Sequence, residues 1–157
     1  METLKLTLLN PKKKSMPSFV FNSAKIGILN ATIDLDSDTF YACLVTSIPA
    51  ATLTTRTGLA EASGGTYAPQ LLSGTILNAP TTATVRWTFT NPSWTNLTTG
   101  TSTPLLGMVI CKRVGSSFAT SDPVIAFLEF NNSFTPSGVT FQVDIPNNTG
   151  VLTATFS

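Results

Sequence analysis

Residues 21–47 read FNSAKIGILNATIDLDSDTFYACLVTS, and this stretch decides the fold. Phe21, Ala24 and Ile28 fall at i, i+3 and i+7, the spacing of one face of a helix. The apolar run at residues 40–47 follows an acidic turn and predicts a buried strand. We expect Ser18 to cap the start of the helix and Asn30 to cap its end near Leu29.

The rest of the chain consists of β-rich runs separated by turn residues. The runs are residues 3–9, 66–79, 82–90, 105–114, 124–130, 139–145 and 151–156, and the turns include residues 78–80, 91–92, 115–117, 131–133, 136–138 and 147–150. Residues 49–65 predict a loop, with at most one helical turn at 56–62. Regular short strands without helical crossovers predict a mainly β, antiparallel β-sandwich that is jelly-roll-like, with one short N-terminal helix.

The 157 residues fit one domain, which at this length buries about 68–70% of its unfolded surface. We expect an extended N-terminal arm at residues 1–18 and a single β-sandwich domain at residues 19–157. Leu4, Leu6 and Leu8 alternate in the arm and are predicted to pair with a foreign sheet edge. Pro11 and Pro17 bracket Lys12, Lys13 and Lys14, which either form a solvated tether or grip an acidic neighbour.

The quoted stretch resembles a family of small tailed-bacteriophage virion structural proteins of the capsid decoration or cement type. Residues 30–39, NATIDLDSDT, are similar to that family's NGTIDLDTDT turn, which an ALVTS strand follows. The resemblance extends to the family's VTWTNLT, AVIYK and PLIAYIDF elements, which are similar to residues 93–98, 107–113 and 122–130. The family's ending is similar to residues 139–143 and 150–153. The chain departs from the family in residues 1–18 and in a loop at 48–65 that lacks an acidic DTHD-type sequence.

Composition excludes several classes of function. Charged residues make up 11% of the chain and the formal net charge is +1, so no strong field recruits nucleic acid or an anionic membrane. No apolar stretch approaches a membrane span, and no secretory signal pattern is present, which predicts synthesis in a cytosol. Low charge with a mean hydropathy of +0.24 favours a surface that a permanent partner covers.

The side chains that carry catalysis are sparse. Histidine is absent, which removes His-assisted nucleophiles and ordinary zinc sites. Asp122, Glu129 and Asp144 are the free carboxylates, but no pattern pairs them, and Glu129 is expected to point outward. We therefore predict no enzyme activity, no cofactor and no small-molecule substrate.

Asp34, Asp36 and Asp38 have the spacing that opens a calcium loop. Thr39 replaces the glycine of such a loop, and Val45 stands where a closing glutamate is required. We expect a turn and no metal.

Two tryptophans and two cysteines complete the candidates. Trp87 alternates with apolar neighbours and is predicted in the core, whereas Trp94 is either buried or exposed and, with Tyr67, could form a sugar-stacking platform. Cys43 and Cys111 are predicted to be buried free thiols, with a disulfide open only if their strands are neighbours.

These observations lead to one expected function and one alternative. The resemblance implies a virion protein, assembled in the host cytoplasm, that binds the major capsid protein and itself, as a trimer or a dimer. Its contacts would come from the six arm residues named above and from Trp94. The alternative is a tail, baseplate or fibre component, including a glycan-binding adhesion module.

Overall fold

A computed structural model describes residues 4–7, 18–81, 84–100, 103–145 and 151–156. Within these ranges the chain forms eleven strands, one α-helix and one 3-10 turn, η1 at Arg56–Gly58. The helix α1 spans Asn22–Leu29. The strands are β1 Leu4–Thr7, β2 Phe19–Val20, β3 Phe40–Val45, β4 Gln70–Leu71, β5 Ile76–Thr81, β6 Thr84–Thr88, β7 Ser93–Leu97, β8 Leu105–Lys112, β9 Val124–Phe134, β10 Val139–Gln142 and β11 Leu152–Phe156.

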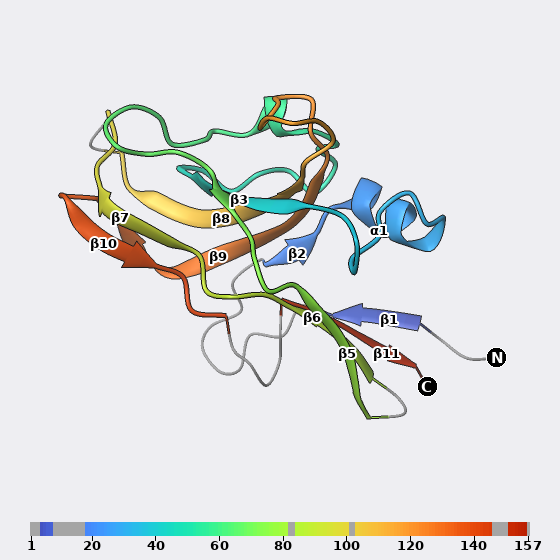
Figure 1. Cartoon of the computed structure of the whole chain (residues 1–157). Coiled ribbons are helices and arrows are strands. Elements are labelled where there is room, and N and C mark those ends of the chain that lie inside the picture. The colour runs from blue at the N-terminus through green and yellow to red at the C-terminus, as the bar shows by residue number, and fades with distance from the viewer. Residues whose placement is uncertain (1–3, 8–17, 82–83, 101–102, 146–150, 157) are drawn as a thin grey trace.

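The strands form two main antiparallel sheets in a sandwich-like arrangement (Figure 1). The larger sheet has the order β2-β9-β8-β3-β4, and the smaller has the order β1-β11-β6-β5. A separate antiparallel pair, β10-β7, lies at the end of the molecule opposite α1. The mainly β, antiparallel fold with one helix is the one that the sequence predicts.

Strand β3 lies at the centre of the core. All six of its residues are buried, and it pairs with β8 from Phe40 opposite Lys112 to Val45 opposite Gly107. A strand with apolar residues at consecutive positions must be covered on both faces. The Trp87 ring of β6 packs against Phe40 with ring centroids 5.0 Å apart, which confirms the prediction that Trp87 is a core residue. Loops at residues 46–69 and 113–123 cover the other face (Figure 1).

The helix α1 begins three residues later than the sequence predicts. Phe21 occupies the N-cap position without a side-chain cap, so the expected cap at Ser18 is wrong. Ser18 instead accepts a hydrogen bond from the Glu129 N–H through its Oγ, because the short strand β2 joins the chain to β9 first. Asn30 is confirmed as the C-cap and donates its N–H to the Ile26 carbonyl.

Three other sequence expectations need correction, and the first is the predicted turn at residues 78–80, which lies inside β5. The run at residues 66–79 forms only β4 and the first part of β5, with irregular backbone between them. The predicted turn at residues 131–133 lies inside β9, where the register with β8 shifts between Glu129 opposite Gly107 and Phe134 opposite Leu105. The predicted turn residues therefore fall in an irregularity of the β8–β9 ladder. None of the helices in the described ranges is long and apolar enough to cross a membrane.

Candidate interaction surface

The predicted contact residues of the arm fall into two groups. Leu4 and Leu6 lie in β1, whose backbone pairs with β11 of the same chain. The other four, Leu8, Lys12, Lys13 and Lys14, lie outside the described residues.

Trp94 does not belong to an exposed surface. Its side chain is 2% exposed, its Nε1–H donates to the Ala68 carbonyl at 2.9 Å, and its ring packs near Phe141. The pairing of β7 with β10 creates this cover. The expected role of Trp94 as an exposed partner-binding residue is therefore wrong, and Trp94 and Tyr67 do not form an open sugar-stacking platform.

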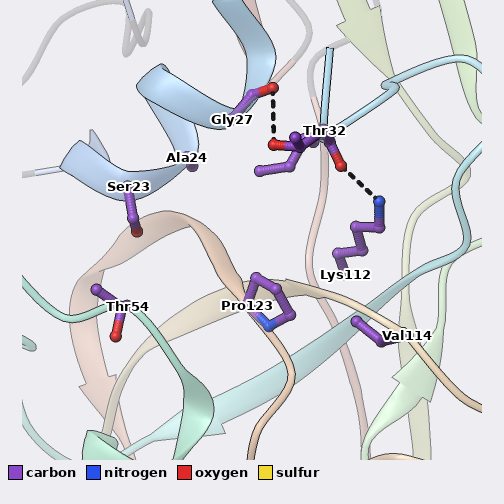
Figure 2. A pocket seen from close by; sticks show the side chains of 9 residues that line it. Ser23, Ala24, Gly27, Thr32, Thr54, Lys112, Val114 and Pro123 are labelled. Atoms are coloured by element: carbon purple, nitrogen blue, oxygen red, sulfur yellow. Dashed lines mark hydrogen bonds between the residues drawn. The ribbon is translucent and has the colours of Figure 1, made fainter. Parts of the chain in front are cut away.

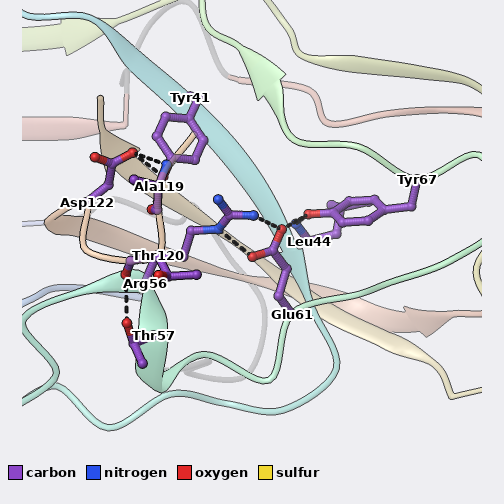
Figure 3. A network of polar contacts seen from close by, with 9 residues as sticks. All are labelled: Tyr41, Leu44, Arg56, Thr57, Glu61, Tyr67, Ala119, Thr120 and Asp122. Carbon is purple, nitrogen blue, oxygen red and sulfur yellow. Dashed lines mark hydrogen bonds and ion pairs between the residues drawn. The ribbon is translucent and has the colours of Figure 1, made fainter. Parts of the chain in front are cut away.

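The most elaborate polar arrangement ties the loop at residues 46–69 to the large sheet (Figure 3). The Arg56 guanidinium donates from Nε and Nη2 to the two carboxylate oxygens of Glu61, at 2.6 and 2.9 Å. The Tyr67 hydroxyl donates to Glu61 Oε1 at 2.7 Å and accepts the Leu44 N–H of β3 at 3.1 Å. The hydrogen bond to Glu61 raises the pKa of Arg56, and burial raises the pKa of Tyr67.

A second set of bonds anchors the loop at residues 113–123. The Tyr41 hydroxyl donates to Asp122 Oδ2 at 2.9 Å, and the same carboxylate accepts the N–H groups of Ala119 and Val114. The Arg56 guanidinium lies over the Tyr41 ring, 5.7 Å from its centroid, and so connects the two sets. Burial raises the pKa of Tyr41.

We call Tyr41, Arg56, Glu61, Tyr67 and Asp122 the polar clamp. Each of its side chains has a hydrogen-bond partner within the protein. These hydrogen bonds fix two loops over the large sheet.

The other two predicted acidic candidates, Asp144 and Glu129, lie outside the polar clamp. Asp144 accepts a hydrogen bond from Asn91 Nδ2 at 3.1 Å. Glu129 does not simply point outward, because it is half-buried and its Oε2 is buried without a hydrogen-bond partner. It stands opposite Gly107 in the β8–β9 ladder. Within the described ranges, no cluster of three or more His, Cys, Asp or Glu side chains could hold a metal.

The aspartates after α1 form a turn. Asp34 Oδ1 accepts the N–H groups of Asp36 and Ser37, and Asp38 Oδ2 accepts the Asp34 N–H at 2.8 Å. The Ser37 hydroxyl and these backbone donors lower the pKa of Asp34. Lys112 reaches Asp38 Oδ2 at 2.6 Å from β8, so the turn is attached to the sheet.

The two cysteines lie on neighbouring strands. Cys43 is opposite Val109 and Cys111 is opposite Tyr41, which makes the two thiols diagonal neighbours on one face of the sheet. Both are free and fully buried, as predicted. Diagonal Cα atoms are about 7–8 Å apart, beyond the usual reach of a disulfide. A hydrogen bond with Cys111 and burial raise the pKa of the Cys43 thiol.

A pocket of about 370 Å³ lies between α1 and the ends of β8 and β9 (Figure 2). The lining residues are Ser23, Ala24, Gly27, Thr32, Ile33, Thr54, Lys112, Val114 and Pro123. Two of its polar side chains are already bonded, since Ser23 donates to the Leu53 carbonyl, and Lys112 donates to the Thr32 carbonyl. The pocket is near the lower end of the sizes that hold small molecules.

Exposed aliphatic side chains gather on the outer side of α1. Ile26 is 64% exposed and Leu29 is 71% exposed, and both lie opposite the buried Ala24 and Gly27. We call this pair the α1 aliphatic face. Val114, 69% exposed, lies on the rim of the nearby pocket. The helical spacing of the sequence held the signal for this face, because Ile26 and Leu29 fall outside the predicted core face.

No protein family model, curated protein or solved structure matches the chain.

Proposed function

We propose that this chain is a virion structural protein that binds the outside of an assembled bacteriophage head as a decoration or cement protein. The observation that carries the proposal is the stretch at residues 21–47, which is similar to such proteins in its helix, acidic turn and buried strand. The binding partners are the major capsid protein and further copies of the chain, as a trimer or a dimer.

The mechanism is stabilisation by mass action. A protein that binds the assembled shell but not its separate subunits shifts the equilibrium toward the shell by RT ln(1 + [L]/Kd). At a free concentration of 100 times Kd this amounts to about 2.7 kcal/mol per site. A rigid fold suits this task because little conformational entropy is lost on docking, and the polar clamp keeps two long loops fixed before binding.

The α1 aliphatic face is the surface that we assign to the shell. Aliphatic side chains exposed to more than 60% lose contact with water when a partner covers them, and Ile26 and Leu29 are such a pair on one rigid helix. Lys25 on the same helix is an exposed charged neighbour of this pair. An apolar centre with charged residues beside it is typical of a contact between separately folded proteins.

Copy number tests the function directly. Quantitative mass spectrometry of purified, DNA-filled heads without tails should find the chain in an amount comparable to the major capsid protein. Absence from heads together with a few copies in tails would contradict the proposal and favour a tail, baseplate or fibre component.

Cosedimentation with shells tests the surface. The double variant Ile26→Glu and Leu29→Glu should bind shells at least about tenfold more weakly, a loss of about 1.4 kcal/mol. Val139→Glu is the matched control, since Val139 is an exposed aliphatic residue, 44% exposed, on β10 at the other end of the molecule. Equal loss in both variants, or none in the first, would show that the α1 aliphatic face is not the contact.

A further inference from the structure

Strand β1 lies at the edge of the smaller sheet and has one strand partner among the described residues, β11. The pairing is antiparallel and runs from Leu4 opposite Phe156 to Thr7 opposite Thr153. The next strand along the chain, β2, belongs to the other sheet, where it pairs with β9. The chain therefore changes sheets between its first two strands.

The sequence between these strands is long enough to reach a neighbouring copy of the chain. Residues 8–18 link β1 to β2, and eleven residues reach at most about 40 Å when extended. A short turn would force two strands to be neighbours, whereas this connection joins elements of different sheets. Among the described residues, the backbone ladder with β11 holds β1 in place.

The sequences of β1 and β11 favour one register of their ladder. Leu4 and Leu6 stand opposite Phe156 and Ala154, so apolar positions share one face of the sheet. Lys5 stands opposite Thr155 on the other face. A slip of one residue would move both leucines to the polar face, which disfavours other registers and unrelated strands.

We propose that β1 is exchanged between copies, so that β1 of one chain pairs with β11 of the next. A second copy offers the same β11 in the same register, so exchange keeps the β1–β11 contacts while joining two chains. Reciprocal exchange gives a dimer, and head-to-tail exchange around a closed ring gives a trimer. The proposal concerns self-association and stands whether or not the chain binds a shell.

Cysteine cross-linking distinguishes exchange from pairing within one chain. Lys5 and Thr155 are directly opposite each other, and Cys43 and Cys111 are fully buried and do not compete. The single variants Lys5→Cys and Thr155→Cys, carrying different affinity tags, are co-expressed as full chains and oxidised. Exchange predicts a covalent heterodimer on a non-reducing denaturing gel. The matched control pairs Lys5→Cys with Ser116→Cys, an exposed loop position, and should give no more than a trace of heterodimer.

The double variant Lys5→Cys, Thr155→Cys tests whether β1 pairs with β11 within one chain. Exchange predicts covalent oligomers from this variant. A monomer two protons lighter, with no heterodimer from the co-expressed single variants, would overturn the proposal. Failure to form either disulfide in chains that retain a β-type circular dichroism spectrum would also overturn it, because β1 would then not lie beside any β11. None of these readouts involves a shell, so they are independent of the proposed head location.

Discussion

Replacing Glu61 by leucine should strongly destabilise the fold, because Glu61 is the centre of the polar clamp. Its carboxylate accepts three hydrogen bonds, two from the Arg56 guanidinium and one from the Tyr67 hydroxyl. The side chains of Arg56 and Glu61 are only 13% and 15% exposed. Loss of the carboxylate leaves a cation with little access to water and no counter-charge.

The magnitude follows from that burial. Removing one partner of a buried ion pair costs about 3–5 kcal/mol, and the residual exposure of both side chains places Glu61→Leu near about 3 kcal/mol. Glu61→Gln keeps the shape and the Tyr67 contact but loses the charge, so we expect about half that cost. Substituting both members of the ion pair, Arg56→Met with Glu61→Leu, should recover most of the loss because no unpaired charge remains.

Urea unfolding followed by circular dichroism measures these differences by linear extrapolation, provided that the slope m is unchanged. Asp36→Asn, in an exposed turn, is the control and should change the free energy of unfolding by less than about 0.5 kcal/mol. A cost below about 1 kcal/mol for Glu61→Leu, or a double variant no more stable than the single one, would refute the account of the clamp.

Three further predictions concern β8 and the buried thiols. Gly107→Ala should lower the free energy of unfolding by about 1–3 kcal/mol in urea titrations. The new methyl group would overlap the Phe127 ring and lie 2.6 Å from the Leu128 carbonyl oxygen. A variant as stable as the wild type would contradict this packing. Cys43 and Cys111 should resist alkylation in the native protein and react fully after unfolding without reductant, and an unlabelled product two protons lighter would show a disulfide instead. The free energy of unfolding should fall as the pH rises above about 8.5, because unfolded thiols ionise there while the pKa of folded Cys43 is raised. Cys43→Ala should reduce this dependence of stability on pH. An unchanged dependence would assign it to other groups.

Local pattern was sufficient to predict part of this structure. The continuous apolar run of β3 indicated burial on both faces, and the alternation around Trp87 indicated a core position. Asn30 was predictable as a C-cap because a short polar side chain is common where a helix ends. In each case the decisive information lies within a few residues.

The errors involve partners that are distant in sequence. Trp94 stands between serine and threonine and has no local sign of burial, and its cover comes from Phe141 and the Ala68 carbonyl. The polar clamp joins two loops to one strand, which no periodicity reveals. One signal was present, because Arg56 and Glu61 are the charged residues of residues 46–69, and such an isolated opposite pair in an uncharged segment is a candidate ion pair.

The pairing of β1 with β11 has a consequence for engineering. Leu4 stands opposite Phe156, so the start of β1 and the end of β11 lie side by side in the smaller sheet. Closely spaced ends are the geometry in which circular permutation succeeds. A short linker between them, with new ends opened in the exposed loop at Gly115, should give a permuted chain with the same sheets. In that chain β1 and β11 become a hairpin, so a turn of fixed length holds β1 beside the β11 of its own chain.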